Sequence, residues 1–285
     1  MRKFFILLVI LVFVGCYKSW REYYSGIDEV CWGSDGKVLF LYSKEWREYN
    51  EDPFSGEPYP VEIEDSIFLY EVNADRSGMR CVCFIGLNEY YSGMSSAGDW
   101  VVYSRREGIN GEDEICVVRR DGSERYNTGV RGRNPDFSPD ASKIVYEKPD
   151  SGIWVMDRDG SNNHCIVPDA DAKYPAWSPD DSLIAYGYFG MQIYNIKSDS
   201  IIREYERVGI PDWGPSGSNE IIVEAYDGPC IIDIVTGEID SMGNLIKGNR
   251  AKWSPDGLWF IAYDGDWFVI SADGSNKWYL KDLIE

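Results

Sequence analysis

Short apolar runs alternate with polar turn sequences along most of this chain of 285 residues. Between residues 137 and 167, for example, the runs at 143–146, 153–157 and 164–167 are rich in isoleucine, valine and aromatic residues. Serine, proline, aspartate and glycine separate these runs, and these residue types set the backbone angles of tight turns. Short apolar runs bounded by such residues predict β-strands rather than helices.

This unit recurs at a nearly constant spacing. The tetrads 137–140, 177–180, 213–216 and 253–256 read Phe-Ser-Pro-Asp, Trp-Ser-Pro-Asp, Trp-Gly-Pro-Ser and Trp-Ser-Pro-Asp. Their aromatic residues lie 40, 36 and 40 residues apart, and an apolar run follows each tetrad. Repeats of this length built from short strands indicate a solenoid or a propeller. Four antiparallel strands per unit correspond to one propeller blade.

The pattern continues upstream with more substitutions. Aligning Trp32 and Met94 with the aromatic position brings the expected number of blades to six, near residues 28–84, 90–127, 134–168, 174–206, 210–242 and 249–282. The first spacing, of 62 residues, exceeds one repeat because it contains an acidic insertion at about residues 44–65. We expect residues 277–281 to supply the last blade's own outer strand. Residues 16–27 should form a tether or an added edge strand.

The aromatic-Ser-Pro-Asp-Gly pattern resembles the WD40-like repeats of TolB-type six-bladed β-propellers. Similar repeats occur in the propeller domains of prolyl-oligopeptidase-type peptidases. The resemblance covers residues 28–282 and implies an all-β propeller of four-stranded antiparallel blades over residues 28–285, preceded by a signal peptide. Only a short segment precedes Trp32, so we expect no counterpart of the amino-terminal domain of TolB. The resemblance therefore implies the fold and points only generally to the cell envelope.

The amino terminus has the pattern of an export signal. A basic start, Met1-Arg2-Lys3, is followed by eleven apolar residues and then by Gly15-Cys16. This run is shorter than the roughly 20 residues of a membrane-spanning helix, and it fits a cleaved signal. Residues 13–16 resemble a bacterial lipobox, which implies removal of residues 1–15 and a lipid on Cys16. We expect a lipid-anchored protein on the periplasmic or outer-membrane side; the alternative is an ordinary cleaved signal with Cys16 incidental.

The charge of the chain restricts its expected partners, and the spacing of its cysteines restricts their expected chemistry. The net charge is −20, and it becomes −22 when Arg2 and Lys3 leave with the signal. Such acidity repels phosphate backbones, so nucleic acid is not an expected partner. The spacing of the other six cysteines contains no Cys-x-x-Cys pattern, and we expect buried, unpaired thiols. They are Cys31, Cys81, Cys83, Cys116, Cys165 and Cys230.

The sequence offers little catalytic chemistry. It contains no Gly-x-Ser-x-Gly pentapeptide and a single histidine, His164, so acyl-transfer catalysis is not expected. Residues 157–162 imitate the start of a calcium loop, but Pro168 stands where the loop needs a bidentate glutamate. We therefore expect no catalytic residues, metal or cofactor. The alternative is a glycosidase-type or lyase-type carbohydrate-active enzyme that uses carboxylates in the central funnel, because 48 acidic residues provide many candidate pairs.

Binding is the expected function. The regular turns share one face of a propeller, and the irregular connections share the opposite face, which we call the loop face; functional residues concentrate on such loops. Four arginines of the second blade form a basic spot there; alternatively, they neutralise nearby acidic loops. We predict a monomeric, non-catalytic propeller that binds a protein, peptide or glycan of the envelope, although a structural spacer remains an alternative. The candidate ligand-binding residues are Arg105, Arg106, Arg131, Arg133, Tyr90, Tyr91, Tyr174, Tyr188, Phe189, Tyr226 and Arg250.

Overall fold

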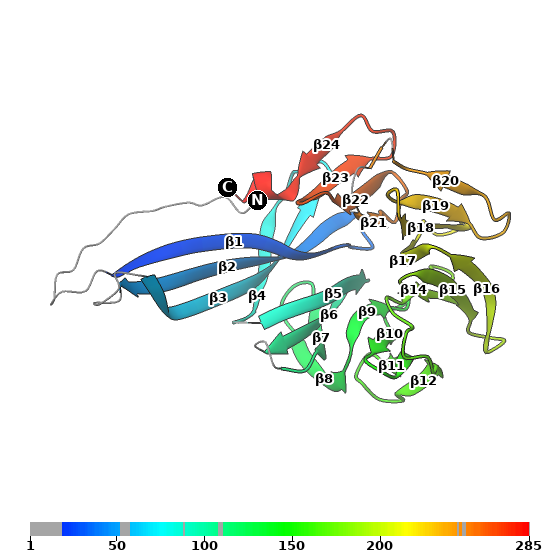
Figure 1. The fold of residues 1–285 in the computed structure, drawn as a ribbon, viewed down its shortest axis with the longest axis horizontal. Coiled ribbons are helices and arrows are strands. Elements are labelled where there is room, and N and C mark those ends of the chain that lie inside the picture. The colour runs from blue at the N-terminus through cyan, green and yellow to red at the C-terminus, as the bar shows by residue number, and fades with distance from the viewer. Residues whose placement is uncertain are drawn as a thin grey trace.

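The protein is a ring of six antiparallel sheets with four strands each (Figure 1). It was analysed as a computed structural model, which describes residues 19–51, 58–87, 89–107, 111–243, 245–246 and 249–284. Each sheet consists of four consecutive strands. The first strand of each sheet lines the centre of the ring. The predicted all-β, six-bladed propeller is therefore confirmed.

The strands follow one another in chain order from blade 1 to blade 6. Blade 1 contains β1 (Ser19–Trp32), β2 (Lys37–Glu51), β3 (Pro58–Asn73) and β4 (Arg80–Leu87). Blade 2 contains β5 (Glu89–Ala97), β6 (Trp100–Glu107), β7 (Glu114–Arg119) and β8 (Arg125–Arg131). Blade 3 contains β9 (Arg133–Phe137), β10 (Lys143–Lys148), β11 (Gly152–Asp157) and β12 (His164–Val167). Blade 4 contains β13 (Ala176–Trp177), β14 (Leu183–Gly187), β15 (Gly190–Asn195) and β16 (Ser200–Glu206). Blade 5 contains β17 (Val208–Trp213), β18 (Glu220–Ala225), β19 (Cys230–Asp233) and β20 (Ile239–Ser241). Blade 6 contains β21 (Asn249–Trp253), β22 (Trp259–Tyr263), β23 (Trp267–Ser271) and β24 (Lys277–Tyr279), followed by the 3-10 helix η1 (Leu280–Leu283).

The Ser-Pro-Asp tetrads build the turn between the first two strands of a blade. The Ser138 hydroxyl accepts the backbone N–H of Lys143 (2.9 Å) and donates to Asp140 Oδ1 (2.7 Å). Ser178 and Ser254 make the same pair of bonds in blades 4 and 6. Because buried hydroxyls need hydrogen-bond partners, the dominant repeat of the sequence is a turn-forming element.

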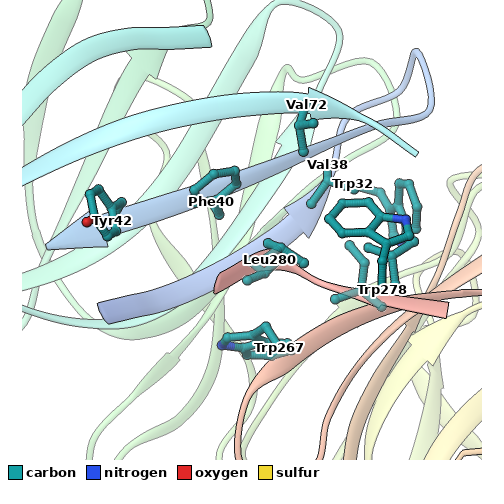
Figure 2. Packing of buried hydrophobic residues seen from close by; sticks show 11 residues of the cluster. Trp32, Val38, Phe40, Tyr42, Val72, Trp267, Trp278 and Leu280 are labelled. Atoms are coloured by element: carbon teal, nitrogen blue, oxygen red, sulfur yellow. The ribbon is translucent and has the colours of Figure 1, made fainter. Parts of the chain in front are cut away.

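Apolar packing between blades closes the ring. In the described residues, six clusters of buried apolar side chains each lie between two neighbouring blades. Figure 2 shows the cluster between blades 1 and 6, in which Trp32 and Trp278 pack beside Leu280. The Trp278 indole also donates to the Ala74 carbonyl (2.9 Å). The predicted outer strand near residues 277–281 is present as β24, so blade 6 is completed without a strand from the amino terminus.

The alignment of Met94 with the aromatic position was wrong by two residues. In β5, Ser96 lies opposite Val101, just as Phe137 lies opposite Ile144 in blade 3. A bulge between Tyr91 and Met94 shifts the register, and buried Met94 packs between blades 1 and 2 instead. Blade 2 thus has a serine where the other blades have an aromatic residue.

The acidic insertion forms regular sheet rather than an irregular loop. It lengthens β2 and β3, and the lengthened β2 pairs with β1 from Ser19 opposite Asn50 to Ile27 opposite Tyr42. The described part of residues 16–27 belongs to the edge strand β1, which is the second of the two predicted alternatives, because the insertion supplies its pairing partner. We call residues 19–25, 44–51 and 58–65 the arm. Figure 1 shows the arm running away from the other blades.

Among the helices of the described residues, none is long and apolar enough to cross a membrane.

Candidate functional site

A channel of about 1050 Å³ runs through the centre of the ring and is lined by all six blades. The turn tetrads border one end, with Pro139, Pro179 and Pro255 among the lining residues. The starts of the inner strands border the other end, which opens on the loop face and which we call the mouth. Inner strands carry a side chain toward the axis at every second position, so the channel collects one set of residues from each blade.

Four non-glycine residues with left-handed backbone conformations stand at the mouth. Asn134, Tyr174, Ile210 and Arg250 have φ angles of 48°, 52°, 49° and 51°, and each lies three residues before the aromatic position of its blade. Gly93 occupies the same position in blade 2, with a φ of 82°. Glycine and asparagine adopt this conformation readily, whereas a β-branched residue there is an outlier. We call these five residues the mouth ring.

Bulges in the inner strands produce the mouth ring. The strand register shifts beside Gly93, Ile210 and Arg250. A Cβ atom on Gly93 would lie 2.6 Å from the Asn134 Cα atom, so only glycine fits in blade 2. Bulges redirect side chains and are frequent beside functional sites. The mouth ring therefore places selected side chains around one opening.

Two glutamates at equivalent positions hold these bulges. Glu147 Oε2 accepts from the Asn134 amide (2.9 Å), and Glu224 Oε1 accepts from the Arg250 backbone N–H (2.7 Å). Burial raises the pKa of the Glu224 carboxyl, and the Arg250 N–H and charge offset part of that effect. The bond to Glu224 links blades 5 and 6 at the mouth.

Aromatic side chains of blade 4 stand next to the mouth ring. The Tyr174 ring lies 5.6 Å from Tyr188, whose ring lies 4.3 Å from Phe189. Phe189 is 84% exposed and Tyr226 is fully exposed. Burial raises the pKa of the Tyr174 hydroxyl, and the nearby carboxylates and Tyr188 add to this effect. The structure thus brings Tyr174, Tyr188 and Phe189 together, and their role in binding stays a prediction.

The predicted basic spot, whose Arg133 lies at the start of β9 in blade 3, is largely neutralised. Arg133 Nε lies 2.6 Å from Asp113, and Arg105 lies 3.7 Å from Glu114. Arg131 forms an ion pair with Glu112. For these three arginines, the contacts match the alternative in which they neutralise acidic residues.

The fourth arginine, Arg106, is different. Its guanidinium carbon lies 5.5 Å from the ring centre of Tyr90, which is 49% exposed. Its buried Nε atom has no hydrogen-bond partner among the described residues. The Tyr91 ring lies 5.8 Å from Tyr103 and packs against the apolar cluster between blades 1 and 2. Arg106 and Tyr90 both line the channel, so this pair borders the mouth on blade 2.

The residue just before the aromatic position ties neighbouring blades together inside the channel. Asp136 Oδ2 accepts the backbone N–H of Trp177 (2.6 Å), and Asp212 Oδ2 accepts that of Trp253 (2.8 Å). These bonds join blade 3 to blade 4 and blade 5 to blade 6. Our sequence analysis missed these two aspartates, although their place next to each repeated aromatic residue was a visible signal.

Lys252 occupies the same position in blade 6. Its Nζ atom donates to the carbonyls of Val30 (3.1 Å) and Met94 (3.3 Å), which belong to blades 1 and 2. Burial in the channel raises the pKa of three neighbouring carboxyls, and the Lys252 charge partly offsets this; they are those of Glu29, Asp136 and Asp212. The pKa of Asp212 rises to about 7. One cation thus links three blades and stabilises several channel carboxylates.

Other candidate groups lie away from the mouth. No cluster of three or more metal-ligating side chains occurs in the part of the chain that the structure describes. His164 is exposed on β12, and its Nδ1 lies 2.8 Å from the Asn162 carbonyl oxygen. No disulfide bond joins any of the six cysteines in the described residues; Cys31, Cys116 and Cys230 are buried, but Cys81 is exposed, so its predicted burial was wrong. Cys16 lies outside the described residues.

Comparison with known proteins supports the fold alone. No protein-family model and no curated protein matches the sequence. TolB from Acinetobacter baumannii has a similar structure, with a TM-score of 0.58 and 12% identity over 90% of this chain and 78% of that chain. An oligogalacturonate lyase from Vibrio parahaemolyticus has a TM-score of 0.52 and 12% identity over 91% of this chain and 98% of that chain. A chain of a mitotic checkpoint complex has a TM-score of 0.54 and 12% identity over 84% of this chain and 86% of that chain.

Proposed function

We propose that this chain is an exported, lipid-anchored recognition protein of the bacterial envelope. It captures a protein, peptide or glycan at the mouth of the channel and performs no catalysis itself. The observation that carries this proposal is the mouth ring, in which tyrosine, isoleucine and arginine occupy left-handed positions.

The fold does not require these side chains. Blade 2 makes the same bulge with Gly93, and blade 3 makes it with Asn134. A residue with a Cβ atom costs about 1–2 kcal/mol in this conformation. Strain of this kind concentrates at ligand-binding and active sites, where the surrounding structure maintains it. Tyr174, Ile210 and Arg250 are therefore best explained by what they contact outside the chain.

The surroundings of the mouth ring favour binding. Tyrosine and arginine are enriched among the residues that dominate binding energies, and the exposed ring of Phe189 is connected to Tyr174 through Tyr188. A lipid on Cys16 would hold the ring at a membrane, because each buried methylene contributes about 0.8 kcal/mol. The resemblance to TolB is consistent with a partner in the envelope.

Partner capture tests the proposal. Immobilised wild-type protein, a Tyr174→Asn/Arg250→Asn variant and a Lys197→Ser control would be exposed to envelope extract and compared by quantitative mass spectrometry. The control removes one exposed positive charge on the opposite face. We expect a bound species that the control retains and the double variant loses. Equal capture by all three proteins would exclude the mouth. The anchor is tested separately, because Cys16→Ala should move the protein from the membrane to the soluble fraction.

One observation favours a carbohydrate-active enzyme as the second candidate. Burial raises the pKa of the Asp212 carboxyl in the channel to about 7, which suits a general acid or base near neutral pH. The carboxylates of Asp136 and Asp212, however, accept backbone N–H groups and hold neighbouring blades together. Incubation with acidic oligosaccharides tests the candidate. Turnover that Asp212→Asn abolishes and Asp240→Asn preserves would support it over capture alone.

A further inference from the structure

The arm is a three-stranded sheet that continues blade 1 beyond the body of the ring. β4 pairs with β3 only between Ser66 and Glu71, so the outer part of β3 has no partner on that side among the described strands. The described arm side chains at 44–49 lie outside the buried clusters. Seven residues of antiparallel strand span roughly 24 Å. Figure 1 shows the arm pointing away from blades 3 to 5.

The strand register identifies what lies at the end of the arm. Trp20 is opposite Tyr49, which is opposite Pro60 on β3, and the next row outward joins Asn50 to Tyr59. We call these residues, with Ser19, the tip. Tryptophan and tyrosine are the residue types enriched at membrane–water interfaces. Neither of these two rows contains a charged residue; Glu51, opposite Pro58, lies one row further out.

The rows nearer the ring also contain aromatic residues, with Tyr23 opposite Trp46, but they differ from the tip in carrying many charged residues. Glu48 is opposite Arg21 on one side and Glu62 on the other. Glu45 pairs in register with Asp65. This part of the arm is acidic, as is the protein as a whole, with a net charge of −20. Anionic headgroups would therefore repel the ring and the inner part of the arm, while the aromatic tip is compatible with a lipid surface.

The position of the proposed lipid on Cys16 indicates that the tip contacts a membrane. Only Tyr17 and Lys18 separate Cys16 from Ser19, and three residue steps reach at most about 11 Å. A lipid on Cys16 would thus fix the tip, and no other part of the described chain, at the bilayer. We propose that the arm is a membrane spacer: its tip rests in the headgroup layer and its length holds the ring off the surface. This inference rests on the anchor proposed above.

The structure of a tethered layer tests the spacer without relying on acylation in the cell. The chain from residue 17, carrying an amino-terminal polyhistidine tag, would be bound to a supported phosphatidylcholine bilayer that contains a nickel-chelating lipid. Neutron reflectometry would then give the protein density along the bilayer normal. We expect a thin layer of low density, roughly 25 Å thick, between the headgroups and the dense ring. Ring density directly on the headgroups would overturn the proposal.

Variants distinguish contact between the tip and the headgroups from attachment of the protein through its tag alone. A Trp20→Ser/Tyr49→Ser variant should broaden the ring density, because its tether alone would set its height, whereas a Phe189→Ser/Tyr226→Ser control should match wild type. An unchanged profile in the tip variant would refute the contact, and an unchanged near-ultraviolet circular dichroism spectrum would show that its ring is folded. Sedimentation of wild type as a dimer that the tip variant loses would instead assign the arm to a second copy and overturn the proposal. Failure of Cys16→Ala to release the protein in cells, with the expected density profile in vitro, would count against the anchor alone.

Discussion

The strain in the mouth ring can be measured at Arg250. This residue is exposed, has a φ of 51°, and is fixed by its backbone N–H bond to Glu224. Arg250→Ala and Arg250→Asn both remove the guanidinium, but asparagine tolerates the left-handed conformation and alanine does not. The difference in the free energy of unfolding between the two variants therefore measures the cost of the left-handed backbone separately from the loss of charge.

The expected magnitude follows from the cost of a left-handed residue. Because that cost is about 1–2 kcal/mol, we expect Arg250→Asn to be more stable than Arg250→Ala by about 1 kcal/mol. In a protein of this size such a difference raises the melting temperature by roughly 2–4 °C. Urea unfolding and thermal scans would measure it, and both variants should lose partner capture equally.

Two results would refute this reasoning. If alanine and asparagine gave equal stability, the backbone at residue 250 would carry no strain, and the argument from the mouth ring would fail. If Arg250→Asn were stabilised but captured its partner as well as wild type, the strain would be real but unrelated to binding. A Lys197→Ala variant serves as the control for loss of an exposed positive charge.

Three further predictions concern the channel. Lys252→Met should lower the free energy of unfolding by about 3 kcal/mol, because it leaves the channel carboxylates without their shared cation; Lys197→Met, measured in the same urea titration, should change little. The raised pKa of Asp212, about 7 against an ordinary 3.8, means that the folded state binds its proton more tightly than the unfolded state. Its contribution to stability is therefore fully present below about pH 4 and declines as the pH rises to about 7, so the stability difference between wild type and Asp212→Asn should vary over that range and stay constant above it. Gly93→Ala should prevent normal packing of blade 2 on blade 3, because its Cβ atom would lie 2.6 Å from a backbone atom. The control Gly98→Ala meets nothing within 4 Å and should lower the free energy of unfolding by only about 1–2 kcal/mol. Equal melting temperatures of the two variants would contradict this prediction.

The repeat in the sequence predicted the fold because it is local turn chemistry. Each Ser-Pro-Asp tetrad makes its hydrogen bonds within about one turn, as at Ser138, so no distant contact has to be known. Blade 2 lacks both the tetrad and the aromatic residue, and there the alignment failed by two residues. The bulge before Met94 depends on contact with blade 3, which periodicity cannot reveal.

The sequence left a tether and an added edge strand open for residues 16–27 for a related reason. Trp20, Tyr23 and Tyr24 are good strand formers, but a strand needs a partner, and its partner is an insertion more than 20 residues away in the sequence. The same limit applies to the arginines of the loop face. Whether Arg133 is available to a ligand depends on its distance from Asp113, which the order of residues does not give.

The mouth itself was predicted only in part. Exposed aromatic residues in irregular loops indicated Tyr188, Phe189 and Tyr226. The mouth ring was not predictable, because Ile210 and Arg250 are residue types that carry no sign of a left-handed backbone. Only Gly93 and Asn134 had that signal, and both are common in ordinary turns.

The junction between blades 1 and 6 is the one place where adjacent blades have no covalent connection. Every other pair of neighbours is joined by a loop, but here the two ends of the chain meet through side chains alone, including the Trp32 indole bond to the Lys252 carbonyl. If β1 is anchored to a membrane while a bound partner pulls on the opposite blades, the force acts across the junction between blades 1 and 6. We therefore expect blades 1 and 6 to separate before any other pair of neighbouring blades, under force or in mild denaturant.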